Sequence, residues 1–274
     1  MKKFYLVTLL SLIATPVLAE VLATSLIEEE SITKSNEHKW CNSSYVGYAW
    51  SMKSGLVNPD ITKFNQVAAG DTDDAPLSNV SYAGISLGRR VFKWLTASFS
   101  YEIFNGFNYQ SYHKNGTLAG NPTTSVDFLR TFSLIHQSAL LNFYIDFPSS
   151  WQTTVGNINI SPELGGGLGV GVNQLNNFQT LTFANVTPTV ALTTLGLLNI
   201  KTSLAWFVNI GISFQPKGTD ANFGFGYRYY NGGKFSTSSK YILNDVNDQS
   251  IVDLAAWTGT IRTNQFKLFL DFDF

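Results

Sequence analysis

Residues 262–274, with the sequence RTNQFKLFLDFDF, decide the fold of this chain. Apolar side chains occupy every second position, and polar or charged side chains occupy most positions between them. Because successive side chains of a β-strand point to opposite faces, this strand has one apolar and one largely polar face. A membrane barrel with lipid outside and a polar lumen suits the pattern, whereas a soluble core would bury the charges. The apolar positions are Phe266, Leu268, Leu270, Phe272 and Phe274.

The N-terminal residues have the pattern of a secretory signal peptide. Lys2 and Lys3 precede an apolar run over residues 4–13, and small residues near Ala19 predict cleavage after it. No later stretch approaches the ~18 apolar residues that a membrane-spanning helix needs, so we expect insertion through strands. The predicted organisation is a signal peptide over residues 1–19, a polar periplasmic tether over residues 20–42 and a transmembrane barrel over residues 43–274.

The composition fits this prediction. Charged residues make up 14% of the chain and aromatic residues another 14%, against about 25% charged residues in ordinary soluble domains. The net charge of −1 argues against a nucleic-acid partner. Cys41 is the single cysteine, which excludes an intramolecular disulfide, and we expect an unpaired thiol without a role.

Alternation like that of the last strand recurs along the chain. In the fourth of these segments, the apolar residues Phe132 and Leu134 occupy even positions, whereas most of the later apolar residues occupy odd positions (we call this odd or even placement the parity of a residue). The change predicts a slip of the alternation near residues 135–137, which we explain as a bulge. Together with residues 262–274 the segments predict eight strands, the last of which must pair with the first because open edges are excluded from hydrocarbon. The other seven are residues 43–51, 80–90, 95–104, 128–147, 158–172, 202–214 and 222–230.

The connections between these strands alternate in length. Short ones lie near Phe92, Ser149 and Lys217. Outer-membrane barrels have short periplasmic turns and long external loops, so the predicted fold is an all-β, eight-stranded antiparallel up-and-down barrel with four long external loops. The long connections cover residues 52–79, 105–127, 173–201 and 231–261.

Four motifs carry a resemblance to a known family: SYAGISLGRRVF, HQSALLNFYIDFP, SLAWFVNIGISFQP and NFGFGYRYYNGGKF. Over residues 43–274 they resemble the OmpA-like eight-stranded outer-membrane barrels of surface antigens and opacity-type proteins. The resemblance implies localisation in the bacterial outer membrane, contact with lipid and lipopolysaccharide, and recognition of the last strand, ending in Phe274, by the barrel-assembly machinery. The family includes adhesins, surface antigens and small porin-like proteins, so several functions remain open. Unlike in the two-domain members of the family, we expect no periplasmic peptidoglycan-binding domain after Phe274.

Charged side chains occupy strand positions that are predicted to point into the barrel, which indicates a network of ion pairs inside it. An eight-stranded barrel has room for side chains and little else, which favours a plug over an ion pathway. We expect Arg228 and Lys267 to share Glu102, Asp271 or Glu163. The complete predicted set is Arg90, Glu102, Asp146, Glu163, Arg228, Lys267, Asp271 and Asp273.

One short motif suggests chemistry. The spacing of His136 and Ser138 resembles the catalytic pair of outer-membrane lipid A deacylases, in which a His activates a Ser nucleophile. That chemistry must face lipid, whereas Ser138 shares the inward parity of Asn142 and Asp146. We therefore predict that the chain is no enzyme and binds no cofactor or metal. The expected function is a surface protein, structural or adhesive, with host or other extracellular ligands at the external loops; the alternatives are a small porin-like channel and, less favoured, a lipid A-modifying enzyme.

Overall fold

The computed structural model describes residues 40–57, 72–73, 75–92, 94–118, 121–184, 190–245, 248–253 and 255–274. The predicted signal peptide and most of the predicted tether lie outside these residues. The first strand begins at Trp40, ahead of the predicted start of the barrel at Ser43.

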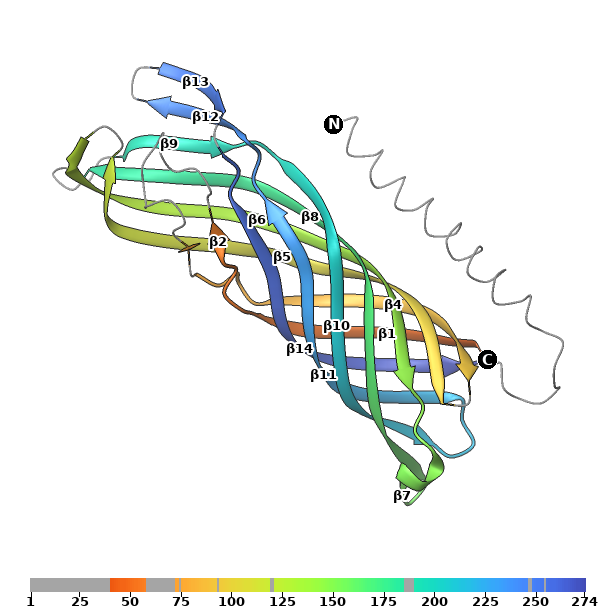
Figure 1. Cartoon of the computed structure of the whole chain (residues 1–274). Coiled ribbons are helices and arrows are strands. Elements are labelled where there is room, and N and C mark those ends of the chain that lie inside the picture. Colours follow the sequence, from red (N-terminus) through yellow and green to blue (C-terminus); the bar gives the residue numbers. More distant parts are fainter. Residues whose placement is uncertain are drawn as a thin grey trace. The chain divides into compact units, whose positions relative to one another are not determined.

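Eight long strands form a closed antiparallel barrel, as the sequence predicts (Figure 1). The strands pair in chain order, and the last returns to the first, so that Tyr45 lies opposite Phe269 and Trp50 opposite Asn264. Because the barrel is closed, each of its strands has a hydrogen-bonded neighbour on both sides within the barrel. Backbone N–H and C=O groups in the hydrocarbon layer of a membrane need such partners. The strands are β1 (Trp40–Ser51), β4 (Val80–Phe92), β5 (Leu95–Leu118), β6 (Asn121–Ile145), β8 (Ile158–Ala184), β10 (Asn199–Pro216), β11 (Ala221–Ser236) and β14 (Thr258–Asp273).

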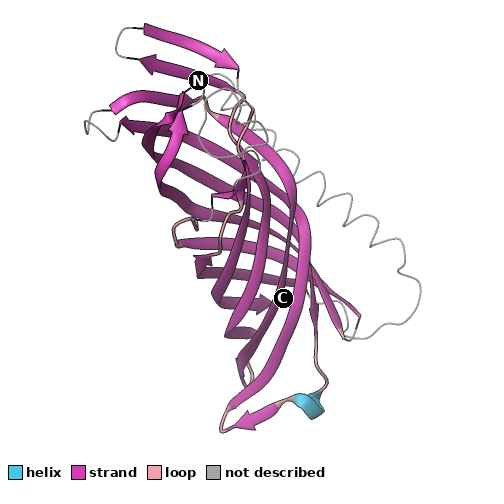
Figure 2. Ribbon diagram, turned by 60° about the vertical axis from the view of Figure 1, so that its left-hand side comes forward, coloured by secondary structure: helices cyan, strands magenta, loops and turns pink. Residues whose placement is uncertain are grey.

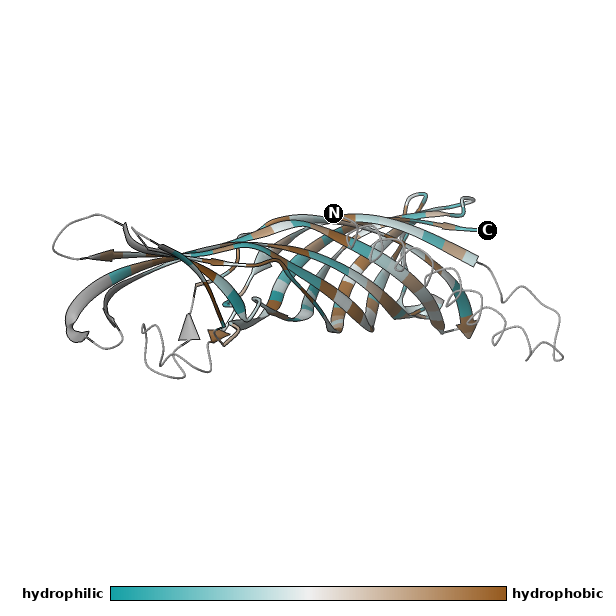
Figure 3. Cartoon of the chain, turned by 90° about the horizontal axis from the view of Figure 1, so that it is seen from above, coloured by the Kyte–Doolittle hydropathy of each residue, from teal (hydrophilic) through white to brown (hydrophobic). Residues whose placement is uncertain are grey.

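The outer surface of the barrel is apolar. Ile85, Leu168, Leu204 and Ile210 are exposed, and the same strands place their polar residues inward. The resulting alternation of apolar and polar positions along each strand is visible in Figure 3. The described residues include no helix with the length and apolarity to cross a membrane. All five apolar residues of the predicted assembly signal lie on the exposed face: Phe266, Leu268, Leu270, Phe272 and Phe274.

The connections at one end of the barrel are mostly tight. β4 and β5 are joined around Trp94, and β10 and β11 around Gly218, whose φ of 79° suits a turn. The connection from β6 to β8 is longer than predicted, because a short 3₁₀ helix, η1 (Ser149–Trp151), leads into β7 (Thr153–Val155), which pairs with β8 (Figure 2). The short-turn end also holds the C-terminus.

At the opposite end, much of the chain predicted as long loops is strand. β5 and β6 run as one hairpin through most of residues 105–127, and β8 continues to Ala184. Three further strands extend the same sheet in the order β8-β9-β12-β13 (Figure 1). These strands are β9 (Val190–Gly196), β12 (Lys240–Asp245) and β13 (Asp248–Asp253), and two-residue strands β2 (Leu56–Val57) and β3 (Thr72–Asp73) also pair.

Three bulges mark the level at which the barrel gives way to this extension. β5 carries an extra residue between Phe104 and Phe107, β8 between Asn176 and Gln179, and β11 between Asn231 and Gly233. Each bulge holds a residue with positive φ: Gly106 at 46°, Asn177 at 53° and Gly233 at 81°. A bulge bends its strand and increases the local twist, so these strands depart from the curvature of the barrel wall.

Side-chain polarity also reverses at the bulges. On the barrel side the outward residues are apolar, such as Ile103 and Ile135; beyond the bulges they are polar, such as Asn108 and Ser133. The inward residues change in the opposite sense and become aromatic. The polar outer face lies beyond the lipid-facing band, at the end that the sequence predicts to be external. We therefore call the strands past the bulges, together with β9, β12 and β13, the extracellular sheet.

The predicted slip within β6 is wrong. Phe132, Leu134, His136, Ser138 and Leu140 are all buried on one face without interruption. The opposite parity of Phe132 and Leu134 arises because they lie at and beyond the level of the bulges, where apolar side chains turn inward. The extra residues belong to the neighbouring strands β5 and β8.

Candidate functional site: the barrel lumen

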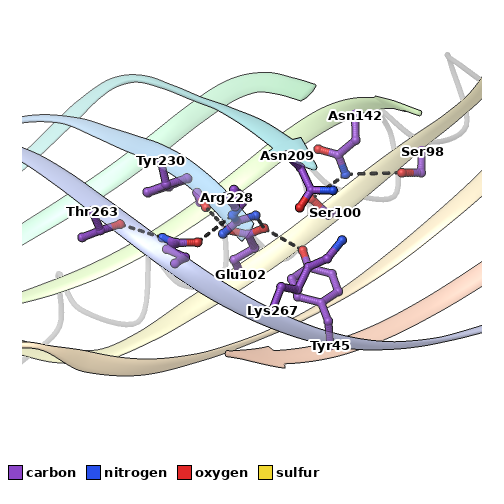
Figure 4. A network of polar contacts seen from close by, with 12 residues as sticks. Tyr45, Ser98, Ser100, Glu102, Asn142, Asn209, Arg228, Tyr230, Thr263 and Lys267 are labelled. Atoms are coloured by element: carbon purple, nitrogen blue, oxygen red, sulfur yellow. Dashed lines mark hydrogen bonds and ion pairs between the residues drawn. The ribbon is translucent and has the colours of Figure 1, made fainter. Parts of the chain in front are cut away.

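A buried ion pair occupies the middle of the lumen (Figure 4). Arg228 on β11 donates two hydrogen bonds to Glu102 on β5, from Nη1 to Oε1 at 2.6 Å and from Nη2 to Oε2 at 2.9 Å. The two strands lie on opposite sides of the barrel, so the pair spans the lumen. Glu102 is 0% exposed and Arg228 is 1% exposed. Such a two-point contact fixes both side chains.

Uncharged groups complete the coordination of this pair. Tyr45 donates its hydroxyl to Glu102 Oε1 at 2.7 Å, and Ser138 Oγ lies 3.4 Å from Glu102 Oε2. Gln265 Oε1 accepts a hydrogen bond from Arg228 Nε at 2.6 Å. The guanidinium also lies over the rings of Tyr82, Phe207 and Tyr230 at 4.7 to 5.0 Å. Hydrogen bonds and aromatic faces together offset the cost of taking both charges out of water.

A second pair lies nearer the short-turn end. Lys267 on β14 donates to Glu163 Oε1 on β8 at 3.1 Å, and Asn209 on β10 donates to the same oxygen at 2.6 Å. The ammonium lies 4.6 Å from the ring centroid of Phe269. The two central cations therefore do not share one carboxylate, since each has its own partner.

The lumen opens into a polar cavity of about 320 Å³ at the short-turn end. Arg90 Nε lies 3.2 Å from Asp146 Oδ2, and Thr96 donates to the same oxygen at 2.8 Å. This pair is partly exposed, unlike the central one. Asp271 and Asp273 line the cavity together with Glu163 and Lys267. All eight charges assigned to the lumen thus fall within it or at its mouth.

The other end of the lumen is closed by aromatic rings. Phe104 stacks on Tyr82 at 5.1 Å and on Tyr230 at 5.2 Å between centroids. The same packing continues outward through Phe107 and Phe132 to the inner face of the extracellular sheet. Within the described residues, these packed rings lie between the polar cavity and the inner face of the extracellular sheet.

His136 belongs to this closing layer. Its Nδ1 contacts Asn173 Oδ1 at 2.5 Å, and its Nε2 contacts the Tyr230 hydroxyl at 2.6 Å. Asn173 also donates to the carbonyl oxygens of Gly232 and Lys234, which lie past Asn231, the last β11 residue that pairs with β10. His136 and Asn173 therefore hold the bulge in place.

Ser138 lies on the same inward face, as its parity predicts, and both it and His136 are buried. The hydroxyl lies near Glu102, while the imidazole contacts Asn173 and Tyr230. A buried hydroxyl without a hydrogen bond to the imidazole is not arranged as an activated nucleophile toward lipid. In the described parts of the chain, no three His, Cys, Asp or Glu side chains are grouped to hold a metal ion.

The charged residues of the lumen were predicted from the sequence, whereas their uncharged partners were not. Tyr45, Asn209 and Gln265 each donate to or accept from a central charge. All three have inward parity on strands that carry or adjoin the charged residues, so parity alone could have nominated them. Their particular contacts cross the lumen and depend on barrel closure.

No protein-family model and no curated protein sequence matches the chain. Among solved structures it is similar to the outer membrane protein OprG from Pseudomonas aeruginosa, with 12% identity and a TM-score of 0.41 over 89% of this chain and 99% of OprG. It is also similar to Ail of Yersinia pestis, solved with the heparin analogue sucrose octasulfate, with 13% identity and a TM-score of 0.33 over 86% and 99% of the two chains. A third is the outer membrane protease OmpT from Escherichia coli, with 9% identity and a TM-score of 0.33 over 89% and 99%. Likeness at this level assigns no activity and no ligand.

Proposed function

We propose that this chain is a bacterial outer-membrane surface protein, structural or adhesive, that binds through its extracellular sheet. A secretory signal pattern followed by a closed barrel with an apolar exterior supports the localisation. Folding of the last strand against β1 and recognition of its apolar face by the barrel-assembly machinery belong to the same proposal. Lipid and lipopolysaccharide are the surroundings that the exposed face implies.

One observation carries the proposal: the strands continue past the lipid-facing band as a packed sheet. Tyr109 stacks on Phe132 with centroids 4.5 Å apart, and Phe132 contacts Phe178 and Phe235 at 6.2 and 5.6 Å. Arg130 lies 3.8 Å over the ring of Trp257 in the same layer. A sheet with its own core presents a fixed surface, which lowers the entropy cost of binding a partner.

A small porin-like channel is the second candidate, and the polar cavity at the short-turn end favours it. Conduction would require the Glu102–Arg228 pair to separate and the rings of Phe104 and Tyr230 to move. Both changes expose buried groups, so a closed lumen is the resting state.

The test combines two measurements on the full chain. In planar bilayers the purified protein is expected to give no steady conductance, whereas large, long-lived channels altered in selectivity by Arg228→Ala would establish the porin instead. In the second, cells expressing the protein are tested for attachment to host-cell and abiotic surfaces. Two large side chains exposed on the extracellular sheet, Tyr112 at 51% and Ile251 at 72%, are replaced by Ser. The control is Gln249→Ser, on the same strand as Ile251.

Attachment that depends on Tyr112 or Ile251, with no conductance, supports the proposal. No attachment by wild-type cells, together with stable channels, contradicts it.

A further inference from the structure

A groove of about 680 Å³ crosses the extracellular sheet near the bulges. Its floor is formed by β5, β6 and β8, and one wall is formed by the segment that precedes β4. Ser78 and Asn108 hold this wall in place: the Ser78 amide donates to the Asn108 carbonyl at 2.7 Å, and the Asn108 amide donates to Ser78 Oγ at 2.8 Å. The Ser51 hydroxyl also donates to the Ser78 carbonyl at 2.8 Å. The groove is thus a built feature of the fold.

The outward side chains of the three floor strands are amides and hydroxyls, which align in rows across the strands. Asn108 lies opposite Ser133, and Ser133 lies opposite Asn176. In the next row Gln110 lies opposite Thr131. These rows arise because each outward position on one strand faces an outward position on the next.

Several of these groups are not engaged within the protein. The side-chain amides of Asn108, Gln110 and Asn177 are exposed and make no hydrogen bond to another residue of the described chain. Each amide offers both donors and an acceptor. None of the residues that line the groove carries a charge: Pro76, Leu77, Ser78, Asn79, Asn108, Tyr109, Gln110, Thr131, Phe132, Ser133 and Asn177.

We propose that this groove binds the uncharged sugar units of an extracellular polysaccharide. Sugar hydroxyls both donate and accept, as amide and hydroxyl side chains do, and the apolar C–H faces of a sugar suit the exposed Pro76 at the side of the groove. The inference rests on the proposed surface function and specifies its ligand class. The sugars could come from the glycolipid of the cell's own outer membrane or from a glycan of another cell.

Three other ligand classes fit less well. An anionic ligand would find no cation among the lining residues. An extended peptide adds to the edge of a sheet, whereas β6, at the centre of the floor, is paired on both sides by β5 and β8. A lipid acyl chain would meet the polar face beyond Ile103 and Ile135.

The test measures binding of soluble oligosaccharides to the full chain in lipid nanodiscs. The probes are maltohexaose, mannohexaose, lacto-N-tetraose, the delipidated polysaccharide of the outer-membrane glycolipid, and a heparin hexasaccharide as the charged comparison. Asn177→Gly removes one groove amide and keeps a residue suited to positive φ, and Gln110→Ala removes another. Gln249→Ala on β13 is the matched control outside the groove.

We expect at least one neutral probe to bind, with affinity lowered about tenfold by Asn177→Gly and by Gln110→Ala and unchanged by Gln249→Ala. Preference for the glycolipid polysaccharide identifies the cell's own surface as the source, and preference for the other neutral probes identifies a foreign glycan. The proposal is overturned if no neutral probe binds up to about 10 mM, if the groove variants bind as wild type does, or if only the heparin fragment binds. Cell attachment that persists in the groove variants would leave the surface function standing without this ligand.

Discussion

Glu102 shows how a charged side chain is accommodated inside the lumen. Burying a carboxylate away from water without a partner is strongly unfavourable. The buried carboxylate of Glu102 accepts two hydrogen bonds from Arg228 and one from Tyr45. The Arg90–Asp146 pair uses the same chemistry at the mouth of the lumen, where 42% and 28% of the two side chains are exposed. Burial, more than the number of ion pairs, decides what each pair contributes.

Replacing Glu102 by Gln is therefore expected to lower the free energy of unfolding by about 3 to 5 kcal/mol, because the Arg228 charge stays buried without a counter-charge. Arg90→Gln, the control at the mouth, should cost at most about 1 kcal/mol, because water solvates Asp146 there. Urea unfolding of the protein in lipid vesicles measures both. Equal losses in the two variants would mean that the central pair is hydrated.

At the scale of elements, the bulges separate a membrane barrel from an extracellular sheet. Gly106, Asn177 and Gly233 supply the positive φ that each bulge requires, and Asn173 donates to the carbonyls of Gly232 and Lys234 at the β11 bulge. Without these irregularities β5, β8 and β11 would continue with the curvature of the barrel wall. The bulges thus create the surface on which the proposed function depends.

We expect Asn177→Gly to leave the stability of the protein nearly unchanged and Asn177→Val to lower it. Asn177→Gly suits a φ of 53° and should leave stability within about 1 kcal/mol, whereas the β-branched side chain of Asn177→Val should cost about 1 to 3 kcal/mol. The same unfolding measurement compares the two variants. A Val variant as stable as the Gly variant would show that the β8 bulge is not a constraint on the fold.

The terminal aromatic residue, which follows β14, can be tested as an assembly signal. Phe274 is exposed, and its backbone amide and carbonyl pair with Trp40 at 2.9 and 3.0 Å. Phe274→Ala keeps these two hydrogen bonds and removes the aromatic ring. Deletion of Phe274 removes the ring and the two hydrogen bonds. If the ring is an assembly signal, both variants should reach the outer membrane at reduced levels in cells yet refold in detergent micelles, as quantified by heat-modifiable gel mobility.

Wild-type levels of Phe274→Ala with a defect only in the deletion would assign the role to the Trp40 pairing. Wild-type levels of both would show that the terminal aromatic is ordinary strand packing.

On the scale of the whole molecule, the barrel separates two chemically different ends. One end carries short turns and the polar cavity, and the other carries the extracellular sheet with its aromatic core. Long external connections and short periplasmic turns are the rule for such barrels. This asymmetry predicts the orientation of the chain in the membrane, with the extracellular sheet outside.

Labelling of single cysteines in a Cys41→Ser background tests the orientation. Gln249→Cys on β13 should react with a membrane-impermeant maleimide in intact cells, because it is exposed on the extracellular sheet. Lys217→Cys in the turn between β10 and β11 should react only after the outer membrane is opened. The reverse pattern would invert the topology.

Alternation with period two and the alternating connection lengths were enough to predict the barrel, its closure between β14 and β1, and the inward side of Arg228 and Lys267. These features follow from which face of a strand meets lipid, and that is a local property of sequence. The parity of Phe132 could not be read in the same way, because the rule that relates polarity to direction reverses where the strand leaves the membrane. Only the tertiary structure assigned Arg228 to Glu102 and Lys267 to Glu163, because these pairs cross the lumen between strands that are not neighbours, and their register depends on closure of the whole barrel.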